Sequence, residues 1–203
     1  MYNLAITTAP ANLAVTLAEA KDQLSIDSDD FQEQITRLIK AATSSIEQKL
    51  WRPLITQTLT LTLPGFPGDN TLPLPRPPIQ SVPAIRYYAD DDAEDMTVLT
   101  AGDYRLFKAM FDTPFVYMKK GRSWPKTADR PDAVEIDFVV GYGDASTDVP
   151  EDIRHAILLT VGHWWANREA VLTGTIATTL PNGVEGLIAP HVHRDPLIYQ
   201  YEG

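Results

Sequence analysis

Apolar positions in the first fifty residues recur at helical spacing. Thr16 and Glu19 have the spacing of a capping box, which predicts a helix that begins at residue 17. The run Ser28–Asp30, with Glu33 as the reciprocal cap, predicts the start of a longer helix. Pro53 is predicted to end that helix, because proline has no backbone N–H to donate. The apolar stripe of the longer helix consists of Phe31, Ile35, Leu38, Ile39, Ala42, Ile46 and Leu50.

After Pro53 the apolar residues recur at every second position, which is typical of half-buried strands. The first alternating run interleaves threonines with Ile55, Gln57, Leu59, Leu61 and Leu63. The proline-rich stretch Leu72–Pro78 is predicted to be a sheet edge or a connector. The acidic residues 90–95 are predicted to form a solvated hairpin loop. Further strands are predicted at Ala84–Tyr88, Met96–Leu99, Asp103–Phe107, Phe115–Met118 and Val134–Val140.

Helical spacing returns at Pro150, which suits the first position of a helix, with Glu151 and Asp152 in the first turn. Its apolar stripe runs through Ile153, Ala156, Ile157, Val161, Trp164, Trp165 and Arg168. A short helix is predicted near Val184–Ala189. The order of patterns predicts an α+β fold. Its helical core comprises residues 1–53 and 143–173, an antiparallel β-subdomain is inserted at residues 54–142, and residues 174–203 form an extended tail.

The tail is too apolar for a solvated terminus, so it is predicted to dock on its own chain or on another subunit. Its apolar side chains are Leu180, Leu187, Ile188, Val192, Leu197, Ile198, Tyr199 and Tyr201.

Composition and charge narrow the function classes. The net charge is −10, and the longest basic cluster is only Lys119-Lys120-Gly121-Arg122, which argues against tight binding to DNA or to an anionic membrane. Without cysteine, the chain can form no disulfide, thiolate nucleophile or cysteine-based zinc site. The N-terminus lacks the pattern of a signal peptide, and no apolar stretch is long enough to span a bilayer. We therefore expect a soluble protein made in the cytoplasm.

Candidate chemistry is sparse. His191, His193 and Asp195 offer two imidazoles and a carboxylate, but no further ligand lies at a recognisable spacing, so surface histidines are the favoured interpretation. His155 and His163 lie eight residues apart, too far to share a metal ion. Nucleophile-elbow and phosphate-loop motifs are absent. The sequence therefore predicts no catalytic residue, metal site or cofactor.

Short phrases spread along the chain carry a resemblance when they are taken in order. They are Leu17–Lys21, Leu24, Asp29-Asp30, Ile46-Glu47, Arg52-Pro53, Leu72–Ile79, Ser81-Val82, Tyr87-Tyr88, Gly141–Gly143, Val149-Pro150, Ala156-Ile157, His163–Glu169 and Pro181–Val184. In this order and spacing they resemble the head–tail connector, or adaptor, family of tailed bacteriophages and gene transfer agents, in its longer form with a β-rich insertion. The resemblance covers nearly the whole chain.

The resemblance implies a structural virion protein at the head–tail interface, made in the bacterial host cytoplasm. Such subunits form a ring, typically dodecameric, beneath the portal protein. The ring extends the DNA channel and docks the head-closure (stopper) or tail-completion protein. An acidic wall would let DNA pass without specific binding.

The same resemblance assigns roles to two sets of residues. The helical core or subunit interface would comprise Phe31, Ile35, Leu38, Ile39, Ile46, Ile157, Val161, Trp164 and Trp165. Docking of the tail on the portal or an adjacent subunit would involve Leu180, Val184, Leu187, Ile188, Val192, Leu197, Ile198, Tyr199 and Tyr201.

Two other classes of protein are alternatives to the adaptor. A small hydrolase would need a converging nucleophile or metal set, and none is visible. A tail or baseplate module could recognise a host-surface ligand through the β-subdomain, provided that Trp124, Tyr87 and Tyr88 form an exposed aromatic platform. The helical segments on both sides of the β-subdomain favour the adaptor.

Overall fold

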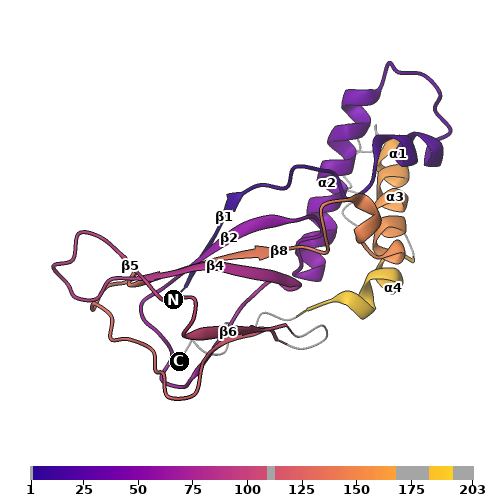
Figure 1. Cartoon of the computed structure of the whole chain (residues 1–203). Coiled ribbons are helices and arrows are strands. Elements are labelled where there is room, and N and C mark those ends of the chain that lie inside the picture. Colours follow the sequence, from indigo (N-terminus) through magenta and orange to yellow (C-terminus); the bar gives the residue numbers. More distant parts are fainter. Residues whose placement is uncertain (1, 109–112, 168–182, 194–203) are drawn as a thin grey trace. The chain divides into compact units, whose positions relative to one another are not determined.

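The computed structural model describes residues 2–108, 113–167 and 183–193 (Figure 1). These residues divide into two compact units. The sheet unit contains residues 2–10, 56–108 and 113–142, and the helical unit contains residues 11–55, 143–167 and 183–193. Mixed α+β architecture is thereby confirmed. Among the described residues, no helix combines the length and apolar character that crossing a membrane requires.

A five-stranded antiparallel sheet, in the order β1-β2-β8-β4-β5, forms the larger part of the sheet unit. Its strands are β1 (Asn3–Thr8), β2 (Gln57–Leu63), β8 (Val134–Val140), β4 (Ile79–Tyr87) and β5 (Thr97–Val98). Burial alternates strictly along the central strands β2 and β8, as the period of two in the sequence predicts. One face of this sheet is therefore apolar and the other is polar.

A three-stranded sheet completes the unit, in the order β3 (Thr71–Pro73), β7 (Phe115–Met118) and β6 (Tyr104–Phe107). The proline-rich stretch supplies β3, which pairs only with β7 among the described strands and so lies at an edge, as predicted. Side chains of both sheets meet in one hydrophobic core. Its buried members include Leu59, Leu61, Leu63, Leu72, Leu74, Ile79, Ile85, Val116, Met118, Val134, Ile136, Phe138 and Val140.

On the polar face of the larger sheet, hydrogen bonds join three neighbouring strands. The Thr60 hydroxyl donates to the Asp137 carboxylate (2.7 Å), which also pairs with Arg86 (2.8 Å). The hydrogen bond that the Arg86 guanidinium donates to Asp137 raises the pKa of Arg86 above its usual value. This face is thus held by polar cross-strand pairs in place of apolar packing.

The helical unit consists of α1 (Leu17–Gln23), α2 (Gln32–Leu50), α3 (Glu151–Ala166) and α4 (Val184–Ile188), with short 3-10 turns at Ser146–Asp148 and Ala189–His191. Helix α2 packs against α1 and α3, and α4 packs against α3. The capping box at α1 is confirmed, with the Thr16 hydroxyl accepting from the Glu19 amide and the Glu19 carboxylate accepting from the Thr16 amide.

Both ends of α2 differ from the prediction. Phe31, and not a residue of the run Ser28–Asp30, occupies the N-cap position, and it makes no side-chain cap bond. Ser28 is used locally, because its hydroxyl accepts from the Asp30 amide (3.2 Å). The helix ends at Leu50, before Pro53, because Trp51 adopts a left-handed conformation (φ 55°). Pro150 likewise precedes α3 as its N-cap residue, one position earlier than predicted.

Strand β1 was not predicted, since residues 1–53 were expected to belong to the helical part. Asn3–Thr8 instead pairs with β2 and forms one edge of the larger sheet. Five of its six residues are exposed, so burial imposes no strict alternation on its sequence. The remaining predicted strands occur in the structure with shifts of a few residues at their ends.

Candidate docking surfaces

The apolar stripes of α2 and α3 divide into core and surface. Ile35, Ile39, Ile46, Ile157 and Val161 are fully buried within the helical unit, so they form its core. Of the other predicted interface residues, Leu38, Trp164 and Trp165 are half-buried and Phe31 is 40% exposed. Only this second group is accessible to a partner.

An aromatic pair marks the accessible part of this stripe. Phe31 packs edge-on against Trp165, with ring centroids 5.4 Å apart and an interplanar angle of 80°. Large aromatic side chains in such positions are enriched among the residues that dominate protein–protein binding. The pair joins the start of α2 to the end of α3, so a partner bound there would contact both helices.

The described part of the tail folds back on its own helical unit. Val184 and Ile188 of α4 are buried (0% and 3% exposed). The chain's own helices cover both side chains, which is one of the two alternatives predicted for the apolar tail. Leu187 is half-buried and Val192 is 48% exposed, so these two remain accessible. Leu180, Leu197, Ile198, Tyr199 and Tyr201 lie outside the described residues.

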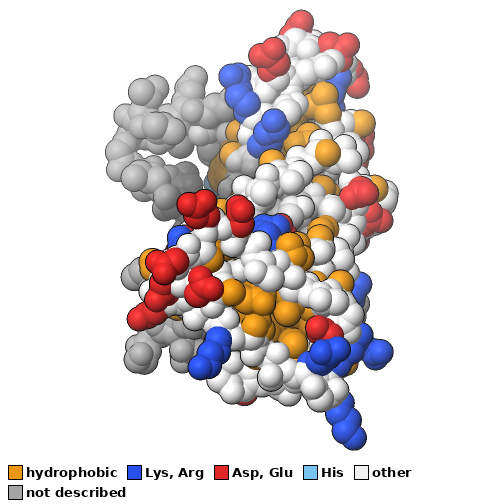
Figure 2. Space-filling view, turned by 60° about the vertical axis from the view of Figure 1, so that its left-hand side comes forward, with side chains coloured by type: hydrophobic (Ala, Val, Ile, Leu, Met, Phe, Trp, Pro, Cys, Tyr) orange, Lys and Arg blue, Asp and Glu red, His pale blue; other side chains and the backbone are white. Residues whose placement is uncertain are grey.

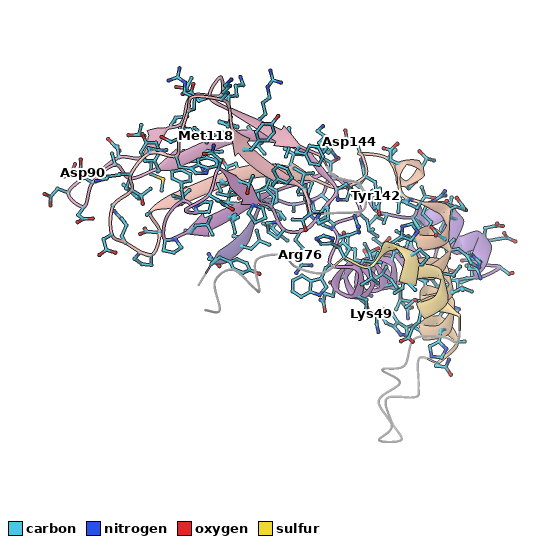
Figure 3. The ribbon with its side chains drawn as sticks, turned by 90° about the horizontal axis from the view of Figure 1, so that it is seen from below. Lys49, Arg76, Asp90, Met118, Tyr142 and Asp144 are labelled. Atoms are coloured by element: carbon cyan, nitrogen blue, oxygen red, sulfur yellow. The ribbon has the colours of Figure 1, made fainter. Side chains whose placement is uncertain are left out.

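Four polar contacts hold this segment in place. The His193 amide donates to the Leu50 carbonyl (2.9 Å), and Arg52 Nε donates to the His191 carbonyl (2.6 Å). His191 Nε2 also lies 2.6 Å from the Asp152 carboxylate on α3. A longer ion pair joins Lys49, labelled in Figure 3, to Glu185 (3.8 Å). These contacts make residues 183–193 part of the helical unit.

Shortening Ile188 tests this attachment. Ile188→Val should lower the free energy of unfolding of the helical unit by about 1 kcal/mol, the usual cost of removing one buried methyl group. Val192→Ala, at an exposed site, should change it by less than about 0.5 kcal/mol. Urea unfolding followed by tryptophan fluorescence in a Trp124→Phe background measures this, since the remaining tryptophans (Trp51, Trp164 and Trp165) all lie in the helical unit. Equal effects of the two substitutions would contradict the attachment.

The three aromatic residues predicted to form an exposed platform, Trp124, Tyr87 and Tyr88, are half-buried, and each packs against a neighbouring side chain. Trp124 stacks on Phe66 with centroids 4.7 Å apart, and its indole N–H donates to the Asp69 carbonyl (3.0 Å). Tyr87 meets the same Phe66 edge-on (5.9 Å). The Arg130 guanidinium covers the ring of the third aromatic residue, Tyr88, at 3.8 Å from its centroid. The platform on which a host-surface binding module depended is therefore missing.

Charge is concentrated at the end of the sheet unit that carries the β4–β5 hairpin. Asp90, Asp91, Asp92, Glu94 and Asp95 are all exposed, as predicted for a solvated loop. Asp90 lies at the outer end of that loop in Figure 3. Figure 2 shows acidic side chains gathered in one part of this face, basic ones at its lower margin and an apolar area between them. The acidic loop therefore presents its carboxylates to solvent or to a partner.

A cavity of about 410 Å³ opens beside β5, where Arg122 pairs with Asp103 at 3.1 Å. Its lining mixes apolar and polar side chains, namely Tyr87, Thr97, Val98, Leu99, Thr100, Asp103, Met118, Arg122, Ser123 and Pro125, with Gly121. The described residues contain no group of three histidines or carboxylates close enough to hold a metal ion. The cavity therefore presents an ion pair among mixed polar and apolar side chains.

The side-chain pKa values that depart from their usual range have structural causes. A hydrogen bond from Lys21 lowers the pKa of Asp29, and one from Arg130 lowers the pKa of Asp132. Burial raises the pKa of Tyr104. These groups lie in separate parts of the chain, at ion pairs and in the core, and do not converge on one site as the groups of an active site would.

Comparison with known proteins gives one family and several solved structures. The family model described as "Head completion protein" (HCP) matches residues 14–193. No curated protein matches the chain.

The solved structures come from gene transfer agent (GTA) particles. A chain from the "Neck of empty GTA particle computed with C6 symmetry" has a TM-score of 0.78 and 25% identity, covering 95% of this chain and 96% of its own. A chain from the "Virion of native gene transfer agent (GTA) particle" has a TM-score of 0.76 and 25% identity, covering 94% of this chain and 95% of its own. A chain from the "Neck of native GTA particle computed with C12 symmetry" has a TM-score of 0.74 and 26% identity, covering 95% of this chain and 96% of its own.

The family match covers most of the chain, and the structural matches extend over both units. Together they confirm the resemblance that the ordered phrases indicated. The chain belongs to the Head completion protein family.

Proposed function

We propose that this chain is a structural subunit of a virion neck, where it connects the head to the tail. The observation that carries the proposal is the match to chains from two GTA necks and one GTA virion over 94–95% of this chain, at TM-scores of 0.74 to 0.78. Because the match includes both the sheet unit and the helical unit, it is a likeness of the whole subunit and not of one common motif.

The subunit would act as part of a ring beneath the portal protein. Two of the matched particles were computed with C6 and C12 symmetry, which favours a cyclic assembly. A dodecameric ring fits both, because twelve-fold symmetry contains six-fold symmetry. Its central channel would continue that of the portal, and its opposite face would dock a head-closure or tail-completion protein.

The charge suits a channel through which DNA moves. A subunit charge of −10 gives a ring that repels phosphates, so the duplex would pass without being held. The exposed acidic loop at residues 90–95 contributes five of the 27 acidic residues. Such a subunit would act by position and shape and would catalyse no reaction.

Docking would use the apolar side chains that the subunit leaves accessible. In the helical unit these include Phe31, Leu38, Trp164, Trp165, Leu187 and Val192. We place the portal contact on this helical group and not on Val184 or Ile188, which are buried. The apolar side chains beyond residue 193 would dock on the portal or on an adjacent subunit.

Co-assembly with the portal tests the function. Purified chain is mixed with its cognate portal ring and imaged by electron microscopy, beside a variant that lacks residues 194–203. We expect the full chain to seat on the portal as a ring and the shortened chain to lose this. The truncation leaves all of the described residues in place, so the shortened chain should give the same circular dichroism spectrum. Absence of any association by the full chain would overturn the proposal.

A further inference from the structure

The two edges of the five-stranded sheet differ in their capacity to accept another strand. On the β5 side, only Thr97 and Val98 form the outer strand, and the exposed Pro83 in β4 has no N–H to offer. The register of β4 also shifts on either side of Ser81. Short strands, prolines and bulges are the features by which proteins prevent pairing at a sheet edge.

The β1 edge carries little of this protection. Asn3–Thr8 contains no proline and no charged residue, and among the described strands it pairs only with β2. Its register with β2 is regular from Asn3 to Ile6 and shifts only between Ile6 and Thr8. The outer backbone N–H and C=O groups of such a strand are a template for a strand supplied by another segment.

An uncovered apolar side chain marks the same edge. Leu4 lies opposite Leu61 in the register, and Ile6 lies opposite Leu59, so both β1 side chains are on the core-facing side of the sheet. Leu4 packs against the core, whereas Ile6 is 63% exposed. Among the described residues, the apolar face therefore continues to the edge without a cover, and an added strand with alternating apolar residues would supply one.

We propose that β1 accepts residues 197–201 of a neighbouring copy of this chain as an added antiparallel strand. These residues read Leu-Ile-Tyr-Gln-Tyr, rich in branched and aromatic side chains that favour strands. Pairing Leu4 with Tyr199 places Leu197 and Tyr201 on the core-facing side as well, beside Ile6 and Tyr2. The alternative register, shifted by one residue, would put Ile198 and Gln200 there and leave Ile6 poorly covered.

A second copy is the occupant because the proposed ring requires it; the inference rests on that ring. Each subunit of a cyclic ring must offer two different surfaces, one for each neighbour. The β1 edge and residues 197–201 are two such surfaces, and their pairing passes from copy to copy around the ring. The better-protected β5 edge would take no part.

Cysteine pairs test this contact directly, because the natural chain has none. In the proposed register Ala5 lies opposite Ile198, at a separation that a disulfide between strands can bridge. Ala5→Cys/Ile198→Cys, seated on the cognate portal and mildly oxidised, should give a ladder of covalent oligomers on a non-reducing gel. The matched pair Val98→Cys/Ile198→Cys, on the opposite edge, should give none. A charge at the edge, Ile6→Lys, should abolish the ladder while its exposed position preserves the fold.

The outcomes separate the contact from the ring itself. Rings that form but yield only an internal disulfide, or none, overturn the neighbour contact and leave the proposed function standing. A ladder that persists with Ile6→Lys also overturns it. The reduced double-cysteine chain could fail to seat although the wild-type chain seats, which would show that residues 5 and 198 tolerate no substitution. The Ile6→Lys chain then decides: its failure to seat supports the contact, and its normal seating overturns it. Failure of the wild-type chain to form any ring overturns both proposals.

Discussion

Replacing Arg154 with alanine is expected to lower the free energy of unfolding of the helical unit by about 3 kcal/mol, the cost of removing one partner from a largely buried ion pair. The Arg154 side chain on α3 is only 14% exposed. It pairs with Glu19 at the start of α1 and with Glu151 one turn earlier on α3. Arg154 therefore joins the two helices through a charge pair that is mostly shielded from water.

The cost arises chiefly at Glu19. Its side chain is 27% exposed, against 83% for Glu151. Glu19 also completes the capping box, because its carboxylate accepts from the Thr16 amide at 2.7 Å. Without Arg154 this carboxylate would stay in place as the cap but lose its cation. Glu151→Gln, by contrast, should cost less than about 0.5 kcal/mol, since exposed ion pairs contribute little.

Urea unfolding in the Trp124→Phe background again gives the measurement, since it reports the helical unit alone. Double-mutant cycles with Glu19→Gln should show that the Arg154–Glu19 coupling exceeds the Arg154–Glu151 coupling. A loss below about 1 kcal/mol for Arg154→Ala would contradict the proposed burial of the pair. So would equal couplings to the two glutamates.

Elements with a strict period could be predicted from the sequence because burial enforces the period. The alternation in β2 and β8 and the stripes of α2 and α3 point to the side chains that are buried in the structure. The capping box at Thr16 could be predicted because its chemistry is local. Strand β1 lacks both kinds of signal, since its partner residues lie fifty or more positions away and five of its six residues are exposed.

Core and surface within one stripe could not be separated in this way. Phe31 and Ile35 lie on the same stripe of α2, yet Phe31 is 40% exposed and Ile35 is fully buried. Spacing gives the direction of a side chain around the helix axis but not what covers it. The tail shows the same limit, because Val184 is buried and Val192 is 48% exposed although both belong to one apolar segment.

One phrase of the resemblance, Gly141-Tyr142-Gly143, has a steric explanation in the structure. Gly141 has a positive φ of 109°, which a side chain would strain. Gly143 has a different reason to be glycine. A Cβ atom there would lie 2.2 Å from Asp148 Oδ2, 2.5 Å from its Cγ and 2.7 Å from its Cβ. The Asp148 carboxylate occupies this space because it accepts from the Ala145 amide (2.9 Å).

Gly143→Ala is therefore expected to destabilise the helical unit by about 2 to 3 kcal/mol, in the range of overpacked sites. Rotating the Asp148 side chain would remove the clash with its carboxylate but not the one with its Cβ atom, so the backbone must also shift. Asp148→Ala should accordingly rescue Gly143→Ala only in part. Asp148→Gly removes every clashing atom, so in its background Gly143→Ala should cost less than about 0.5 kcal/mol. Urea unfolding of the three single variants and the two double variants decides this, and full rescue by Asp148→Ala would show that the carboxylate alone excludes a side chain at Gly143.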